Sequence, residues 1–154
     1  MLGEEEIREI QEEMRHYPDK QAACIEALKV VQRKHRWVSD EHLKEIADIL
    51  GMSIHQVDSV ATFYNLVFRK PVGRHVILLC SSITCWVVGY TSLLEYLQKK
   101  LGIALGQTTS DDRFTLLHVP CLGTCDHAPA LLIDNDLHRD LTLEKIDHIL
   151  DSYS

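Results

Sequence analysis

Apolar residues recur at helical spacing through roughly the first 65 residues, with no alternating run typical of a strand. The first expected helix starts at the acidic turn Glu4–Glu6 and ends at Tyr17–Pro18. Ser39 and Ser53 can each cap a later helix, and Gly51 can end the helix that follows Ser39. These signals predict an N-terminal helical bundle.

The pattern changes at the turn-rich joint Arg69–Gly73, where we place a domain boundary. The bundle then occupies residues 1–70, and a second domain occupies residues 71–154. The second domain opens with Val76–Leu79, a continuous apolar run typical of a buried strand. Its later expected elements are a helix over about Val87–Leu101, the strands Phe114–Val119 and Ala130–Ile133, and a last helix capped by Thr142. The order β-α-β-β-α after a helical bundle predicts an α+β fold.

The helix between the first two expected strands has a consequence for two cysteines. Strands joined in this way run parallel through a right-handed crossover, so they end at the same edge of the sheet. Cys80 ends the first strand, and Cys121 lies just beyond the second. We therefore expect the loops that follow to converge at one edge, where open α/β sheets usually bind ligands.

Composition and charge narrow the functional classes. A chain of 154 residues can bury a core without disulfide staples. A net charge of −7 and scattered basic residues argue against binding to nucleic acid or to an anionic membrane. The sequence shows neither a leader peptide nor an apolar run of membrane-spanning length, so we expect a soluble, cytoplasmic protein. Cytoplasmic thiols stay reduced, which favours metal ligands over disulfides.

Four of the five cysteines form two close pairs, Cys80-x4-Cys85 and Cys121-x3-Cys125. Two short loops that each carry two thiols can surround one small metal centre. Structural zinc more often uses Cys-x2-Cys loops, so the spacing favours a [2Fe-2S] cluster. Spacing alone leaves an atypical zinc site and disulfides or inert thiols open. A thioredoxin-like thiol enzyme is disfavoured because neither pair is Cys-x2-Cys.

In a [2Fe-2S] site, Cys80 and Cys85 would bind one iron and Cys121 and Cys125 the other. The cluster with its four thiolates carries a formal charge of about −2, which becomes about −3 on reduction, so hydrogen-bond donors must offset it. Gly123 would let the second loop turn tightly and direct N–H groups at sulfur. Hydroxyl groups that could also donate, or could simply belong to ordinary loops, are those of Ser81, Ser82, Thr84 and Thr124.

Other residues with reactive or unusual chemistry fit less active roles. Cys24 lies on an apolar helix face, where a cysteine acts as a small hydrophobic residue. His118 and His127 are the histidines nearest the cysteine loops, and for His127 we favour a supporting role over ligation because four sulfurs complete the site. The bond before Pro129 could be trans or cis. No nucleophile–base set, phosphate loop or dinucleotide motif is present.

These motifs together resemble the small NuoE-type [2Fe-2S] subunits of respiratory complex I, NADH-quinone oxidoreductase. The resemblance runs from about Glu12 to the C-terminus. The segments that carry it are the two cysteine loops Cys80–Cys85 and Cys121–Cys125, then Ala128–Pro129, Val60–Tyr64 and Pro71–Arg74. One departure is Pro120, where many relatives carry an acidic residue.

The resemblance implies a thioredoxin-like ferredoxin domain with Cys80, Cys85, Cys121 and Cys125 as the ligands of one [2Fe-2S] cluster. It implies a flavoprotein partner that binds NADH and FMN, with the cluster, of the type called N1a, as a one-electron site beside the flavin. Other subunits of the peripheral arm of complex I would be further partners, and the chain would be peripheral to the membrane. The bundle would clamp the flavoprotein, either through an exposed patch around Phe63, Tyr64, Leu66 and Phe68 or with these residues as internal core.

Two alternatives remain beside this interpretation. Close relatives serve NAD-linked hydrogenases and formate dehydrogenases, and sequence discriminates these poorly from the complex I subunit. A zinc-stapled assembly module with no redox role is an alternative from a different class.

Overall fold

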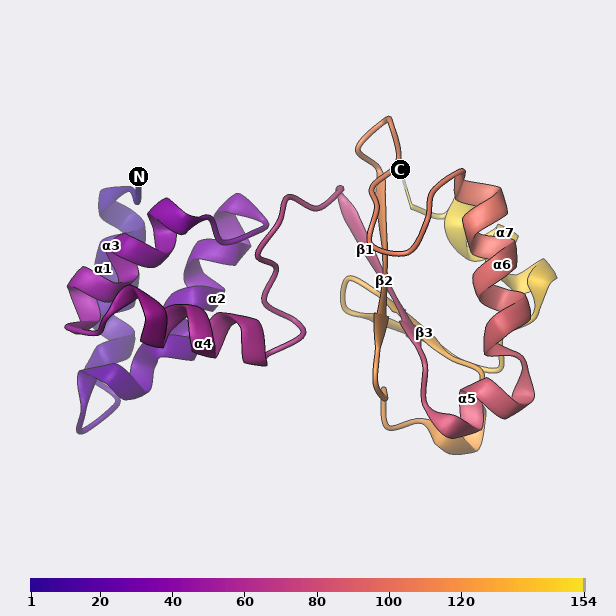
Figure 1. Ribbon diagram of the computed structural model, residues 1–154, viewed down its shortest axis with the longest axis horizontal. Helices are drawn as coiled ribbons and strands as arrows, with labels where there is room; N and C mark the ends of the chain where they lie inside the picture. Colours follow the sequence, from indigo (N-terminus) through magenta and orange to yellow (C-terminus); the bar gives the residue numbers. More distant parts are fainter. Residues whose placement is uncertain (154) are drawn as a thin grey trace. The chain divides into compact units, whose positions relative to one another are not determined.

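The computed structural model describes residues 1–153, which divide into two compact units at Pro71 and Val72. Among the described residues, the first unit contains only helices, and all strands belong to the second (Figure 1). The mixture of helices and one sheet confirms the predicted α+β class. The assignment of residues 1–70 and 71–154 as two domains stays a prediction.

The helices of the first unit begin where local signals predict, although α1 ends at Met14, before the expected Tyr17–Pro18. They are α1 Glu4–Met14, the 3-10 turn η1 Lys20–Ala23, α2 Cys24–His35, α3 Asp40–Leu50 and α4 Ile54–Phe63. Ser39 and Ser53 each accept a hydrogen bond from the third residue of the following helix, and both caps are reciprocal capping boxes. Gly51 ends α3 at φ 66°, a conformation that glycine adopts without strain.

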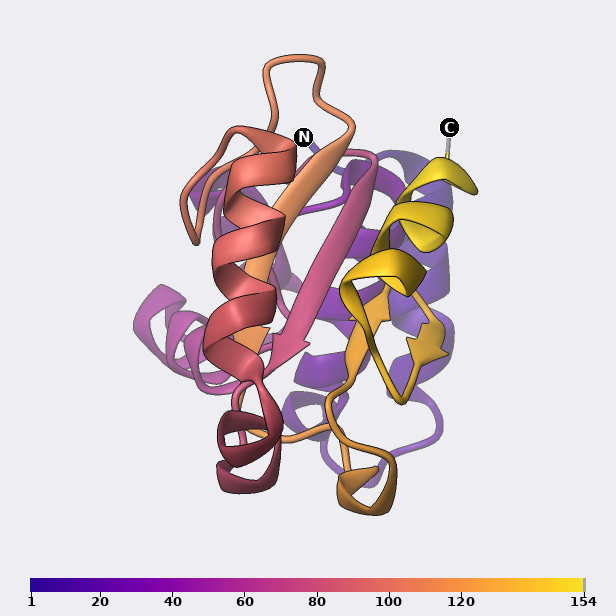
Figure 2. The same cartoon turned by 90° about the vertical axis from the view of Figure 1, so that its right-hand side faces the viewer.

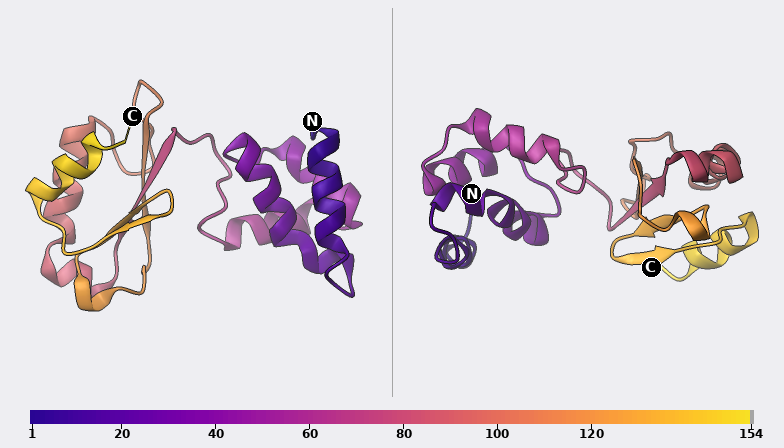
Figure 3. Two further views of the ribbon diagram at one scale, coloured as in Figure 1. Left: turned by 180° about the vertical axis from the view of Figure 1, so that it is seen from behind. Right: turned by 90° about the horizontal axis from the view of Figure 1, so that it is seen from below.

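One core holds the helical unit together. Helix α2 packs against α1, α3 and α4 (Figure 3). The largest side chains without solvent exposure in this core are Ile10, Leu28, Leu43, Ile46 and Leu50. Cys24 is buried in the same core and forms no disulfide, which confirms its interpretation as a small hydrophobic residue.

The second unit is built on a four-stranded sheet of order β2-β1-β3-β4. Its elements are β1 His75–Cys80, α5 Ile83–Val88, α6 Tyr90–Leu101, β2 Phe114–Val119, the 3-10 turn η2 Cys125–His127, β3 Leu131–Ile133, β4 Asp136–His138 and α7 Leu143–Asp151. As predicted, β1 and β2 are parallel, with His75 opposite Phe114 and Cys80 opposite Val119. Strand β3 is antiparallel to both β1 and β4.

Helices α6 and α7 cover one face of this sheet (Figure 2). Ile77 and Leu79 of β1 pack in one cluster with Leu97 of α6 and Ile146 of α7. This core fixes β1, and therefore the position at which its last residue, Cys80, leaves the sheet.

Two expectations for this unit were wrong. The single helix expected over Val87–Leu101 is two helices, because Gly89 has φ 134°, outside the helical region. The first of them, α5, begins at Ile83 and includes Cys85. A fourth strand, β4, was also missed, since it has only three residues and depends on pairing with β3.

No helix within the described part of the chain combines the length and the apolar character needed to cross a lipid bilayer.

Replacing Ser53 with alanine should test the cap of α4. The Ser53 hydroxyl accepts the Gln56 N–H at 3.2 Å, so its loss should lower the free energy of unfolding by about 1 kcal/mol. Ser59→Ala is the control, because the Ser59 hydroxyl only bonds back to the His55 carbonyl of the same helix. Urea unfolding followed by helical circular dichroism measures both. An equal loss for the two variants would contradict the capping role.

Ionisation of the Cys24 thiol should make the free energy of unfolding depend on pH in the alkaline range. Burial raises the pKa of Cys24 from 9.0 to about 11, so this group contributes stability below pH 9 that is lost as the pH rises through 11. The difference in free energy of unfolding between wild type and Cys24→Ala should therefore narrow over this range. Chemical unfolding at several pH values measures it, and a constant difference would contradict the assignment.

Candidate metal centre

The parallel pair β1 and β2 brings the two cysteine loops to one edge of the sheet, as predicted. Cys80 is the last residue of β1 and pairs with Val119, the last residue of β2, so Cys121 follows two residues beyond the same edge. The segments after the two strands, α5 and η2, lie at this edge (Figures 1 and 2). Backbone hydrogen bonds link the end of β1 to the neighbouring segments. The Ser81 N–H donates to the Val119 carbonyl at 2.9 Å, and the Cys80 N–H donates to the Ala130 carbonyl at 3.1 Å.

The first pair, Cys80 and Cys85, is buried. Cys80 is the last residue of the strand, Ser82 is the N-cap of α5, and Cys85 follows in the first turn of that helix. The two thiols hydrogen-bond to one another. The helix therefore folds the second thiol back onto the first.

The second pair, Cys121 and Cys125, is exposed. The two sulfur atoms are 3.8 Å apart, and the N–H of Gly123 donates to the Cys121 sulfur at 3.3 Å. Gly123 has φ 75°, so the loop uses the conformational freedom of glycine. The role predicted for Gly123 is confirmed for the Cys121 sulfur.

Backbone N–H groups also connect the loops to the buried pair. The Leu122 N–H, from the second loop, donates to the Cys80 sulfur. The Ala130 N–H, just before β3, donates to the Cys85 sulfur. These two donors were not predicted, because neither is visible without the sheet that positions them.

The electrostatics of the buried pair distinguish its two thiols. Burial opposes ionisation of Cys80, but hydrogen bonds from the backbone N–H groups of Ser82 and Leu122 favour the thiolate, and the pKa of Cys80 is lowered overall. Burial is the main reason that the pKa of Cys85 is raised, and the neighbouring Cys80 raises it further. Cys80 is therefore the thiol of this pair that loses its proton more readily.

The arrangement of the thiols fits a two-metal cluster. All five cysteines are free thiols. Within residues 1–153, no three His, Cys, Asp or Glu side chains gather as ligands for one metal ion. The thiols instead form two close pairs, as a [2Fe-2S] cluster requires when each iron takes two of them. Two buried hydroxyl groups within the loops, Ser82 Oγ and Thr124 Oγ1, also lack a hydrogen-bond partner.

The two nearby histidines are not brought together with the thiols as ligands. His127 is held by Asp140, whose carboxylate lies 3.0 Å from Nδ1. The same two residues are joined by the bond from Asp140 N–H to the His127 carbonyl at 2.9 Å. His118 lies on β2 with its side chain exposed. The peptide bond between Ala128 and Pro129 is cis.

An apolar surface beside the site was not predicted. Helix α5 exposes Trp86 by 60%, Val87 by 70% and Ile83 by 73%, although it also carries the buried Cys85. The signal in the sequence was an apolar run that continues past Cys85, but the expected helix began only at about Val87 and no exposed face was assigned to this segment.

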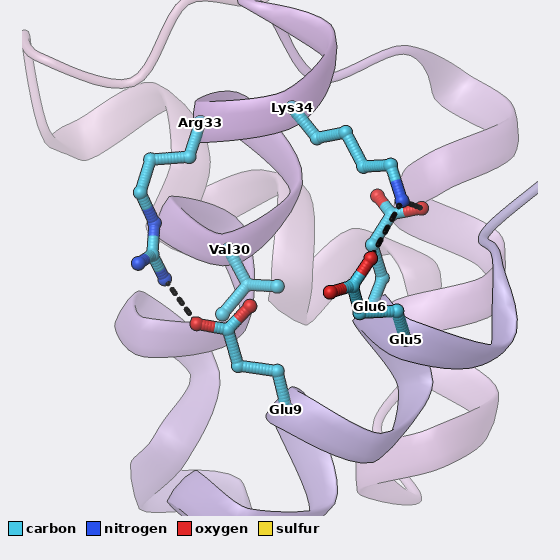
Figure 4. Close-up of a pocket in the computed structure, with 6 residues that line it drawn as sticks. All are labelled: Glu5, Glu6, Glu9, Val30, Arg33 and Lys34. Carbon is cyan, nitrogen blue, oxygen red and sulfur yellow. Dashed lines mark hydrogen bonds and ion pairs between the residues drawn. The ribbon is translucent and has the colours of Figure 1, made fainter.

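The helical unit contains a shallow cleft of about 200 Å³ between α1 and α2 (Figure 4). Its charged side chains pair across it: Arg33 binds Glu9 at 2.8 Å, and Lys34 lies 3.7 Å from both Glu5 and Glu6. Its lining residues carry three carboxylates and two cationic groups, and none of them is a thiol.

Comparison with known proteins agrees with this geometry. The family model of thioredoxin-like [2Fe-2S] ferredoxins matches residues 10–154. The E subunit of NADH-quinone oxidoreductase from Pseudomonas aeruginosa is 50% identical over 153 residues, which cover 99% of this chain and 92% of that protein. The protein of the same name from Escherichia coli K12 is 50% identical over 152 residues, with the same coverage.

A solved structure shares the fold. The crystal structure of an NAD+-reducing [NiFe]-hydrogenase in the air-oxidized state matches with a TM-score of 0.72 and 24% identity over 83% of this chain. This chain spans only 22% of that hydrogenase chain. The family match over most of the sequence and the two relatives of nearly equal length lead to one conclusion: the chain belongs to the thioredoxin-like [2Fe-2S] ferredoxin family and is an electron-transfer protein with a [2Fe-2S] cluster.

Proposed function

We propose that the chain is the electron-transfer component of an NADH-quinone oxidoreductase. It would hold an N1a-type [2Fe-2S] cluster beside the FMN of a partner flavoprotein that binds NADH. The observation that carries this proposal is 50% identity to the E subunits of that enzyme over nearly the whole of both proteins. A role as a component of an NAD-linked hydrogenase is a weaker candidate function, since the likeness of this chain to the hydrogenase structure rests on the fold alone.

Cys80, Cys85, Cys121 and Cys125 are the proposed ligands. When bound, a [2Fe-2S] cluster takes up and releases one electron at a time. Cys80 and Cys85 are buried and would anchor one iron to the end of β1 and to α5. Cys121 and Cys125 are exposed and would hold the other iron on the side open to a partner.

The backbone around these thiols suits a group of negative charge. The N–H groups of Leu122, Gly123 and Ala130 all donate to cysteine sulfur atoms. Hydrogen bonds to sulfur stabilise negative charge and become more favourable as that charge grows on reduction. The loops therefore supply electrostatic support as well as ligands.

A partner surface next to the cluster explains the exposed apolar side chains of α5. Exposed apolar patches commonly mark protein interfaces, and Trp86 is a residue type enriched among binding hot spots. Helix α5 also carries Cys85, so a flavoprotein seated on Ile83, Trp86 and Val87 would lie beside the cluster. We propose this contact as the route by which electrons reach the cluster.

The helical unit offers a second candidate surface for the same flavoprotein. Phe63, Tyr64 and Leu66 are exposed, so the alternative that they form internal core is wrong, whereas Phe68 is partly buried. Docking of the bundle through this patch stays a proposal. Further peripheral-arm subunits would then hold the assembly at the membrane, to which the chain would be peripheral.

Cys121→Ala should abolish or severely destabilise the cluster, because one iron would lose half of its protein ligands. The control is Cys24→Ser, which removes a buried thiol of the helical unit and should leave the cluster spectrum intact. Visible absorption before and after dithionite, with iron and acid-labile sulfide analysis, measures both. A normal spectrum in Cys121→Ala, or a colourless wild-type protein with stoichiometric zinc, would refute the assignment.

Trp86→Glu should weaken binding to the flavoprotein at least tenfold, because it places a charge in an apolar interface. Leu137→Glu is the matched control, as Leu137 is also an exposed apolar residue but lies on β4. Association of the two purified proteins and the rate of cluster reduction by NADH through the flavoprotein measure the effect. Equal binding by wild type and Trp86→Glu would exclude α5 from the interface.

A further inference from the structure

The two cysteine loops contain hydroxyl groups whose surroundings differ sharply. Ser81 donates its hydroxyl to the Val119 carbonyl at 3.0 Å, so this group is already used. Thr84 is partly exposed and open to water. Ser82 Oγ and Thr124 Oγ1 are buried and make no hydrogen bond of acceptable geometry. The fold therefore separates four similar side chains into two that are satisfied and two that are not.

The unsatisfied pair is concentrated at the proposed site. Among the described residues, three buried side-chain polar atoms lack a partner, and the third is Arg113 Nε. Arg113 still donates through Nη2 to the carbonyls of Leu150 and Tyr153, so its guanidinium is otherwise well used. Ser82 and Thr124 have no other donor group in their side chains. A buried hydroxyl without a partner costs about 1–3 kcal/mol, so one in each cysteine loop requires an acceptor.

Each of these hydroxyl groups belongs to a residue of a cysteine loop, beside the sulfur atoms of the proposed ligands. Ser82 lies between Cys80 and Cys85 in sequence and is close enough to both sulfurs to favour their thiolate forms, which acts to lower the pKa of each. Thr124 directly precedes Cys125 and is the N-cap of the turn η2. One hydroxyl thus belongs to the buried pair of thiols and the other to the exposed pair.

We propose that Ser82 and Thr124 donate hydrogen bonds to sulfur atoms of the bound cluster and thereby raise its reduction potential. This inference rests on the ligand set proposed above. Reduction adds one electron, with no covalent bond made or broken, and makes the site more negative. A hydroxyl donor stabilises the more negative state more strongly, so its removal should disfavour reduction.

Ser82→Ala and Thr124→Val test the proposal, with Ser81→Ala as the control from the same loop. We expect each of the first two to lower the equilibrium constant for reduction about tenfold, which corresponds to about 59 mV for one electron. Ser81→Ala should leave the potential near that of wild type. The full chain is purified anaerobically and titrated with dithionite under redox mediators, and the reduced cluster is followed by visible absorption and electron paramagnetic resonance.

Unchanged reduction potentials in Ser82→Ala and Thr124→Val would overturn the proposal. A shift in Ser81→Ala equal to that in these two variants would also overturn it. Ser82→Thr and Thr124→Ser keep the hydroxyl and should keep the wild-type potential, even where the first variants lose the cluster. A large shift in these conservative variants would also overturn it. A wild-type chain without iron and sulfide would instead overturn the proposed function, so the two failures are distinguishable.

Discussion

Parallel pairing of β1 with β2 determines where the four cysteines of the centre lie. The register sets Cys80 opposite Val119, and both strands end there, so two loops distant in sequence start from the same edge. Parallel strands need a crossover, which α5 and α6 supply. The buried contacts of Ile77 and Leu79 hold β1 against α6 and α7, so the packing of the core also positions the first ligand. A shift in this register would separate the thiol pairs.

The two pairs differ in a way that suits a centre at a protein interface. Cys80 and Cys85 are buried and receive N–H groups from Leu122 and Ala130, so they belong to the rigid framework. Cys121 and Cys125 are exposed, and the apolar α5 lies at the same edge of the sheet. An electron carrier needs both properties, because its ligands must stay fixed while one side remains accessible to a partner.

Most of the features that were predicted depend on local sequence, and most of those that were missed depend on tertiary context. Caps at Ser39 and Ser53 and the stop at Gly51 follow from hydrogen bonds and dihedral preferences within a few residues. The break at Gly89 was missed because apolar spacing continues across it. The exposure of Trp86, and the different hydrogen bonding of Ser81 and Ser82, are set by neighbours that only the folded sheet provides.

A crystal structure of the anaerobically purified protein, with diffraction data collected at the iron absorption edge, tests the proposed centre most directly. We expect two iron positions at the edge formed by β1 and β2, one bound by Cys80 and Cys85 and the other by Cys121 and Cys125. A single metal ion shared by all four sulfurs, or disulfides in place of metal, would contradict the proposed centre.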